Sequence, residues 1–184
     1  MKYRLPLALL SLLATACSGG ISLSGVSIVP NVTGAQVTVT TNSAEGTYGV
    51  VAVQPSVTFH VNAGSSGAAI TQATVEVVDS SGNAYGNAYA NSYVAVLPMG
   101  YTCPADPSGV NCAPAERQPV ARQVSTTGYL LSQAVANQIA NDCLNGPDCP
   151  DVRLNITFTG KDANQAPIAL TVNRVPVAIE IKGP

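Results

Sequence analysis

The chain has 184 residues, of which 8 are Lys or Arg, 10 are Asp or Glu and one is His. It is 46% hydrophobic, which excludes the disorder expected of chains that are poor in apolar residues. A formal net charge of −2 offers no basic surface for phosphates, so no nucleic acid partner is expected. One His and ten scattered acidic residues offer little catalytic chemistry. The length predicts one domain with additional segments.

Residues 1–16 have the features of a secretory signal peptide. Lys2 and Arg4 precede an apolar run over residues 5–13, and the small residues 14–16 (Ala-Thr-Ala) form a cleavage site directly before Cys17. The apolar run is too short for a transmembrane helix. Cleavage removes two of the 8 bases, so the mature chain has 6 bases against 10 acids and a net charge of −4.

The cleavage site resembles the signal of bacterial lipoproteins, in which signal peptidase II cuts before a cysteine that carries a diacylglyceryl thioether. Thr15 and Ala16 fit that pattern, whereas Ala14 stands where the family prefers Leu. The resemblance implies that Cys17 carries lipid, including palmitate, and anchors the chain to a membrane. Ser18 in place of Asp after the cysteine implies the outer membrane. Plain secretion after the same cleavage site is the alternative, and it differs only in the lipid.

Residues 17–34 are predicted to be the lipidated N-terminus and a tether, because they are rich in Gly and Ser. From residue 35 onward apolar and polar residues alternate, as expected of strands with one buried face. The alternating apolar residues are Val37 and Val39; Val57, Phe59 and Val61; Val75 and Val77; Leu154, Ile156 and Phe158; and Val175, Val177, Ile179 and Ile181. Turn residues at 79–83 and 161–164 lie between such runs, and Pro176 favours an edge strand.

This series of short strands predicts an all-β fold, an antiparallel sandwich over residues 35–184. Residues 71–85 and 154–172 resemble stretches of bacterial immunoglobulin-like or fibronectin-type-III-like domains. The resemblance implies an immunoglobulin-like β-sandwich, although the Cys…Trp…Cys core signature of that family is missing from the sequence.

Residues 98–150 interrupt the alternation and are predicted to be a disulfide-pinned insertion with one helix, not a second domain. The residues that recur at helical spacing are Leu131, Ala134, Val135, Gln138 and Ile139. Ser125, Thr126 or Thr127 is expected to cap the start of the helix, and residues 145–147 (Asn-Gly-Pro) are expected to end it.

Four cysteines follow Cys17, and in an exported protein they are expected to form disulfides. They allow three connectivities, of which we favour the two local pairs, Cys103 with Cys112 and Cys143 with Cys149. A zinc site or a redox pair is disfavoured because neither spacing is Cys-x-x-Cys. Cys17 is then the odd cysteine and is left for acylation.

His60 is the only imidazole, and the alternation places it opposite Phe59, toward solvent or a partner. A hydrolase would have to use this His or a pair of carboxylates. The aspartates considered fall mostly in predicted turns and caps, and they are Asp79, Asp106, Asp142, Asp148, Asp151 and Asp162. Calcium at residues 79–83 or near Asp148 and Asp151 is the less favoured interpretation. No catalytic residue, metal or cofactor is predicted.

Three tyrosines recur at four-residue steps in the segment 82–93, at Tyr85, Tyr89 and Tyr93. That step places all three on one face of a strand. One interpretation is tyrosine packing across a wet strand face. The other is a patch that binds a protein or a glycan, because Tyr is enriched in interfaces.

The sequence therefore predicts an exported lipoprotein at the cell envelope that is not an enzyme. We expect a binding or assembly subunit of an envelope or surface-layer complex, because wide uncharged strand faces can be covered by a protein partner. The alternative is a carbohydrate-binding module that uses the tyrosines, and a small hydrolase is the third hypothesis.

Overall fold

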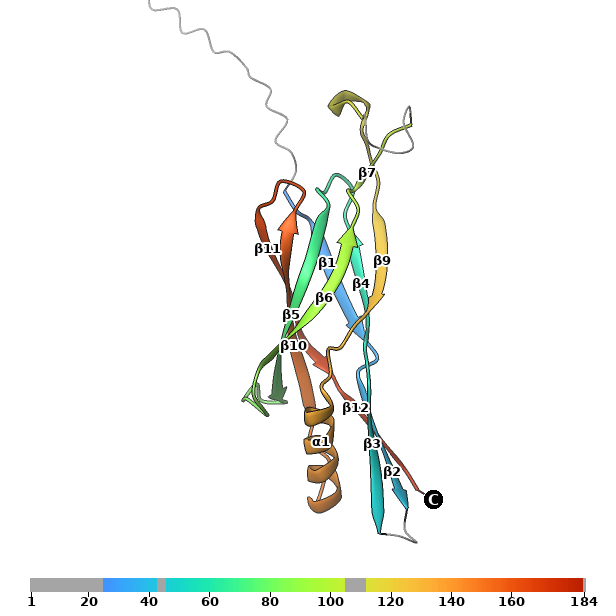
Figure 1. Ribbon diagram of the computed structural model, residues 1–184, viewed down its shortest axis with the longest axis vertical. Helices are drawn as coiled ribbons and strands as arrows, with labels where there is room; N and C mark the ends of the chain where they lie inside the picture. The colour runs from blue at the N-terminus through green and yellow to red at the C-terminus, as the bar shows by residue number, and fades with distance from the viewer. Residues whose placement is uncertain (1–24, 43–45, 105–111, 184) are drawn as a thin grey trace, which may run out of the picture.

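The computed structural model describes residues 25–42, 46–104 and 112–183. The signal peptide, Cys17 and the tether up to residue 24 lie outside the described residues, and so does Asp106. The fold is mostly β with one helix, as predicted (Figure 1). Its strands form sheets along an elongated molecule, with the helix at one end and a protruding loop at the other.

One long hairpin runs through the molecule and contributes to two sheets. Its first arm contains β1 (Ile28–Thr33) and β2 (Gln36–Asn42), and its second arm contains β3 (Thr47–Val53) and β4 (Ser56–Val61). β1 pairs with β4, and β2 pairs with β3, both antiparallel. The arms are interrupted at Gly34, which has a φ of 80°, and at the buried Pro55. Since a positive φ strains residues with a side chain, Gly34 suits this break.

The tether predicted over residues 17–34 is therefore too long, because residues 28–33 form β1. Its inward side chains are Ile28 and Val32, both buried in the core. Pro30 lies between these two apolar positions and obscures their pattern in the sequence.

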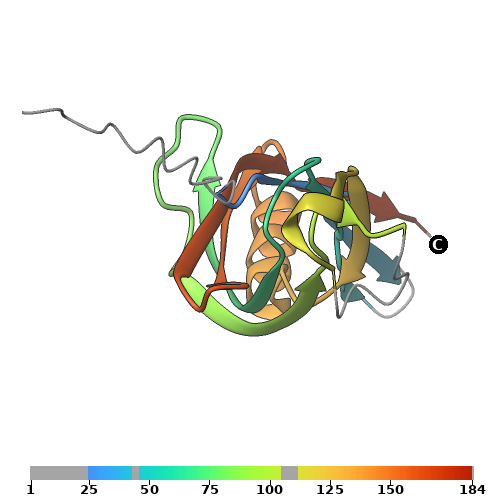
Figure 2. The ribbon, with the colours of Figure 1, turned by 90° about the horizontal axis from the view of Figure 1, so that it is seen from above.

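Two sheets pack face to face in the half of the molecule that contains β1 (Figure 2). The first has the order β1-β4-β9, where β9 is Arg122–Thr127. The second has the order β11-β10-β5-β6, and its strands are β5 (Ala68–Asp79), β6 (Tyr89–Leu97), β10 (Val152–Asp162) and β11 (Pro167–Pro176). Pro176 belongs to an edge strand, as predicted, and the turn at 161–164 joins β10 to β11.

The alternating residues of the sequence form the core between these sheets. Val57, Phe59 and Val61 are buried on β4, and Leu154, Ile156 and Phe158 are buried on β10. The rings of Phe59 and Phe158 meet edge to face at 5.1 Å between centroids. The period of two therefore identified the buried face of these strands correctly.

A third sheet, with the order β12-β2-β3, extends the hairpin beyond the sandwich. β12 (Ala178–Lys182) pairs in parallel with β2, so the prediction of a purely antiparallel arrangement is wrong at this strand. The run 175–181 was also expected to be one strand, but it divides at Val177 between β11 and β12, which lie in different sheets. We call β12, β2 and β3 the distal sheet.

The helix α1 (Gln133–Asn145) packs on the distal sheet. Its buried residues are Val135, Ala136, Ile139 and Ala140, which join the same hydrophobic cluster as Val37 and Val39 of β2. The predicted N-cap at residues 125–127 is wrong, because these residues lie in β9. The N-cap is Ser132, whose side chain accepts a hydrogen bond from the Val135 N–H at 3.2 Å. The helix ends at Asn145 before Gly146, as predicted.

The described residues 98–104 and 112–121 form a protrusion that we call the head. It contains the short strands β7 (Tyr101–Thr102) and β8 (Gln118–Pro119) and a 3-10 turn, η1 (Pro114–Glu116). Arg122 ties it to the body, donating to the carbonyls of Met99 and Tyr101 at 3.1 and 3.0 Å. Thus segment 98–150 holds more than a loop and a helix, since β9 within it is a full strand of the sandwich.

Both local disulfides that the sequence favoured are present. Cys103 pairs with Cys112 in the head, and Cys143 pairs with Cys149 beside the end of α1. Because disulfides persist in oxidising compartments, they indicate a protein that is not cytoplasmic. Within the described ranges, no helix has the length and hydrophobicity needed to cross a membrane.

Candidate binding surface

Tyr93 belongs to the core and cannot contact a partner. Its side chain is only 2% exposed, and its ring lies 5.0 Å from the ring of Phe158. The phenol oxygen is 2.5 Å from the Thr126 hydroxyl of β9, so Tyr93 links the two sheets of the sandwich. Burial raises the pKa of this phenol. The hypothesis that Tyr93 faces a protein or glycan partner is wrong, because inward positions of β6 are covered by the opposite sheet.

Tyr89 is half-buried and holds the segment that leads into α1. Its hydroxyl donates to the Leu130 carbonyl at 2.9 Å and accepts from the Ser132 N–H at 3.2 Å. Burial raises the pKa of the Tyr89 phenol. Both bonds are made within the chain, so the polar end of this side chain stabilises the fold.

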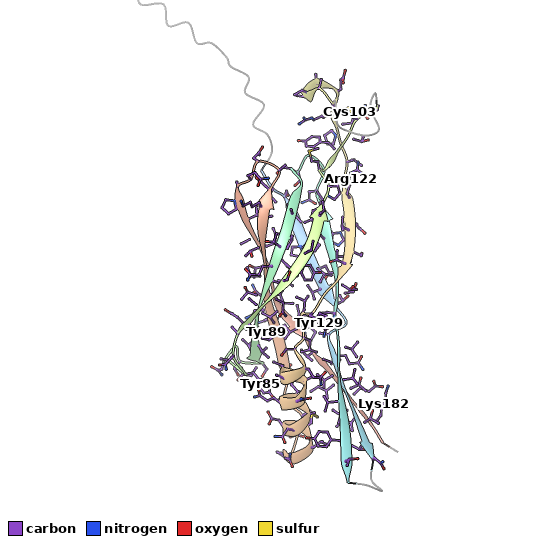
Figure 3. The ribbon with its side chains drawn as sticks, viewed as in Figure 1. Tyr85, Tyr89, Cys103, Arg122, Tyr129 and Lys182 are labelled. Atoms are coloured by element: carbon purple, nitrogen blue, oxygen red, sulfur yellow. A yellow bond between two sulfur atoms is a disulfide. The ribbon has the colours of Figure 1, made fainter. Side chains whose placement is uncertain are left out.

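Tyr85 lies before β6 and points at the helix (Figure 3). Its hydroxyl donates to the Asp142 carboxylate at 2.5 Å. Burial, followed by the hydrogen bond to Asp142 and the charge of that carboxylate, raises the pKa of Tyr85 above its ordinary value. The three tyrosines therefore do not form one exposed patch, because their hydroxyls bind β9, the α1 entry and α1 itself.

A shallow cleft of about 440 Å³ lies between residues 86–91 and the start of α1. Amide side chains line much of it, including Asn87, Asn91 and Gln138. Asn91 and Gln138 already donate to the carbonyls of Tyr129 and Tyr85, at 2.6 and 3.0 Å. The polar groups of this cleft therefore serve mainly to connect α1 to the sandwich.

The carboxylates in turns bind their own backbone. Asp79 accepts from the N–H groups of Ser81 and Asn83, both at 2.9 Å, and also from the Asn83 side chain. These hydrogen bonds, that of the Asn83 side chain first, lower the pKa of Asp79. Asp162 accepts from the N–H groups of Asn164 and Ala166 at 2.8 Å. Both turns thus have the local hydrogen bonding that makes Asp common in turns.

The other residues weighed for catalysis or metal binding are dispersed. Asp151 forms an ion pair with Arg153 at 2.9 Å, which lowers the pKa of Asp151. His60 is half-buried on β4, opposite in direction to the buried Phe59, between Val29 and Gln123 of the neighbouring strands. In the part of the chain that the structure describes, no three His, Cys, Asp or Glu side chains gather as a metal site requires.

Exposed apolar side chains concentrate on the distal sheet and α1. Ten large hydrophobic residues of the described chain are exposed, and five of them lie here, namely Tyr48, Val51, Val53, Leu144 and Ile181. β3 was not among the predicted binding segments, although its sequence TYGVVAV carries three of these five residues. Because successive side chains of a strand point to opposite faces, apolar residues at consecutive positions of β3 must lie on both faces of the sheet. This pattern could have indicated the exposed apolar residues from the sequence.

The face of the distal sheet turned away from α1 is nearly neutral, and we call it the outer face. Val51 and Val53 lie on it, 57% and 38% exposed, opposite Thr38 and Gln36 in the register. The outer face carries the carboxylate of Glu180 on β12. This carboxylate accepts a hydrogen bond from the Gln36 side chain at 2.8 Å and forms an ion pair with Lys182 at 3.2 Å. The outer face is therefore a strip of Val and Thr bordered by one compensated ion pair.

The chain matches no protein-family model, and comparison with curated proteins finds no match.

Proposed function

We propose that this chain is an exported lipoprotein whose body is a binding or assembly subunit of a cell-envelope complex and not an enzyme. The observation that carries the binding role is the outer face, where Val51 and Val53 remain exposed beside neutral Thr and Gln side chains. Exposed apolar side chains surrounded by neutral polar ones are a feature of protein-binding surfaces. Its partner is a protein with a neutral, apolar surface, because the outer face presents no uncompensated charge.

Export and anchoring are supported by independent features. The two disulfides fit an oxidising compartment outside the cytoplasm. The four paired cysteines leave Cys17 as the odd one, at the position where the lipoprotein signal places its acylated cysteine. Acyl chains supply about 0.8 kcal/mol for each buried CH₂, so a multiply acylated Cys17 anchors the chain stably. Because anionic head groups repel an acidic protein body, the lipid supplies the anchoring.

We further propose that the two packed sheets form an immunoglobulin-like sandwich. A three-stranded and a four-stranded sheet around an aromatic core support this interpretation. The parallel β12 and the helix-backed distal sheet are additions to that plan. A carbohydrate-binding role through the tyrosines is not proposed, because the ring of Tyr93 is buried.

The binding role is tested by cross-linking the full protein in its native membranes, followed by affinity purification and mass spectrometry. We expect one stoichiometric partner. The variant Val51→Lys places a charge on the outer face and should reduce recovery of that partner about tenfold, which corresponds to about 1.4 kcal/mol. Val94→Lys is the matched control, because Val94 is 77% exposed on β6, in a different sheet.

Recovery of the protein alone contradicts the assembly role, and equal loss of the partner in both variants contradicts its assignment to the outer face. Anchoring is tested separately by the mass of the N-terminal peptide and by Cys17→Ala. We expect a diacylglyceryl modification on Cys17 and release of the alanine variant from membranes. A mature N-terminus at Cys17 without added mass identifies a secreted protein.

A further inference from the structure

The described chain begins beside the base of the head. Ser27 is bound to the loop at residues 62–65: its carbonyl accepts from the Asn62 N–H at 3.0 Å, and its N–H donates to the Ser65 hydroxyl at 2.9 Å. Gly100, at the base of the head, binds the same loop. A Cβ on Gly100 would lie 2.1 Å from the Asn62 carbonyl oxygen, so this close junction requires glycine. The chain entry and the head therefore share one end of the molecule (Figure 1).

The length of the connection to Cys17 limits where a membrane can be. Gly25 lies eight Cα-to-Cα steps after Cys17, and eight steps span at most about 29 Å when fully extended. By contrast, the first arm of the long hairpin contains 15 positions from Ile28 to Asn42. At about 3.3 Å per residue it extends about 50 Å away from the entry. The far tip of the hairpin therefore lies beyond the reach of the tether.

Charge is distributed unequally between the two ends. The head end carries three cations against two carboxylates, namely Arg117, Arg122 and Lys161 with Glu116 and Asp162. The helix end carries five carboxylates against two cations, namely Asp79, Asp142, Asp148, Asp151 and Glu180 with Arg153 and Lys182. These described residues give the head end a net charge of +1 and the helix end −3, while Glu76 and Arg174, both beside Asn155, cancel each other. Outside the described residues, Asp106 adds a negative charge between Cys103 and Cys112, and Glu45 adds one between β2 and β3. The net negative charge of the mature chain is therefore on the side of the helix end. An anionic lipid surface repels the acidic helix end and does not repel the neutral head end.

We infer that the head faces the lipid surface and that the distal sheet with α1 faces away from it. This orientation rests on the proposed anchor at Cys17. It places the described part of the head, with the disulfide between Cys103 and Cys112, nearest the membrane (Figure 3). The outer face, with Val51, is then on the membrane-distal part of the molecule, where a partner outside the lipid layer can reach it.

The absence of Trp from the sequence provides a clean test. Two variants each introduce one fluorophore at an exposed position: Met99→Trp in the head, where Met99 is 42% exposed, and Tyr48→Trp near the hairpin tip, where Tyr48 is 49% exposed. The full lipidated protein is reconstituted in vesicles of phosphatidylethanolamine and phosphatidylglycerol that contain dansyl-labelled phosphatidylethanolamine. Energy transfer from Trp to dansyl then reports the distance of each end from the lipid.

We expect energy transfer at least several-fold more efficient from Met99→Trp than from Tyr48→Trp, and intact circular dichroism in both. Protein that floats with vesicles but shows equal transfer, or stronger transfer from Tyr48→Trp, overturns the orientation while leaving the anchor intact. Protein that does not float with vesicles overturns the proposed anchor and the orientation with it. The Cys17→Ala forms of both variants supply the background signal.

Discussion

The sandwich and the distal half of this molecule are stabilised by different interactions. Between the sandwich sheets, the rings of Phe59, Phe158 and Tyr93 meet edge to face at 5.0 to 6.5 Å. In the distal half, the apolar contact between α1 and the distal sheet is made mainly by Ala, Val and Ile. It is attached to the sandwich by polar side chains that bind backbone groups.

Gln54 shows how these polar attachments work. It lies where the second hairpin arm breaks between β3 and β4, and its amide oxygen accepts from the N–H groups of Leu130 and Leu131 at 2.8 and 3.0 Å. Its amide nitrogen donates to the Leu131 carbonyl at 2.8 Å. Gln133, the first residue of α1, makes similar hydrogen bonds to β3. Its side chain donates to the Val50 carbonyl at 3.0 Å and accepts from the Ala52 N–H. Gln133 thus satisfies backbone groups of the edge strand β3, and Gln54 satisfies those of the segment that leads into α1.

The difference indicates how each half should respond to damage. Loss of a core ring removes stability from the whole sandwich, because all its sheets share one hydrophobic cluster. Loss of a polar attachment should allow the distal half to unfold while the sandwich stays folded, since local unfolding occurs in regions with few buried apolar contacts. The following predictions test this contrast.

The largest effect is expected from Phe158→Ala. Phe158 is fully buried and contacts both Phe59 and Tyr93, so its truncation leaves a cavity that the neighbouring rings cannot fill. We expect a loss of about 3–5 kcal/mol in the free energy of unfolding. Urea denaturation measures it, and hydrogen exchange should accelerate in both halves. A change confined to the distal half would contradict the shared core.

Gln54→Ala should destabilise mainly the distal half. It leaves two N–H groups and one carbonyl of residues 130–131 without their partner, at a cost of about 2–4 kcal/mol. Hydrogen exchange by mass spectrometry should show faster exchange in α1 and β3 and unchanged exchange in β5 and β10. Gln123→Ala, at an exposed position of β9, is the control. Uniform acceleration along the chain would show that the halves do not separate.

Removing the disulfide beside α1 with Cys143→Ser and Cys149→Ser tests a third contribution. The bridge closes a sequence separation of 6 residues, and the loss of that loop constraint costs about 2–3 kcal/mol. We expect the last turn of α1 to fray, seen as faster exchange at residues 140–145. The same change at Cys103 and Cys112 should affect only the head, and a loss of α1 protection there would contradict this independence.

Tyr85→Phe should have the smallest effect, about 1 kcal/mol near neutral pH, because it removes a single half-exposed hydrogen bond to Asp142. Its signature is the alkaline pH dependence. The folded protein holds the Tyr85 proton more tightly than the unfolded chain does, since its pKa is raised from 10.0. The contribution is therefore present below pH of about 10 and is lost as the pH rises further.

Unfolding by urea at pH 8 and pH 10.5 measures this contribution. The wild type should lose more stability between the two pH values than Tyr85→Phe does. An equal loss in the two proteins would show that other tyrosines, such as Tyr93, account for the alkaline sensitivity.

The sequence predicted the strands whose inner faces carry large apolar residues, such as Phe59 on β4 and Phe158 on β10. It missed β9, where Val124 is the one apolar residue of six and the pairing with β4 comes from tertiary contact. The same omission displaced the helix cap, because Ser125 looked free to cap when it was a strand residue. Long-range pairing, which local periodicity does not contain, decided both outcomes.

The tyrosines show the corresponding limit at the candidate site. Their spacing indicated a common strand face, but Tyr85 lies before β6 and Tyr93 is covered by the opposite sheet. A sequence pattern can identify a face without showing what lies against it. The disulfides were more predictable, since short separations such as that between Cys143 and Cys149 favour local pairing.

The parallel pairing of β12 with β2 has a mechanical consequence. The chain enters at the head end, and its last described strand runs toward the opposite tip. A force between an anchored N-terminus and a partner that holds the C-terminal strand would pull β2 and β12 in opposite directions along their length. The five residue pairs from Gln36 and Ala178 to Thr40 and Lys182 would then bear the load together in shear, not one after another as in unzipping. The pairing of β2 with β12 would therefore resist such a force more strongly than a ladder that opens one pair at a time.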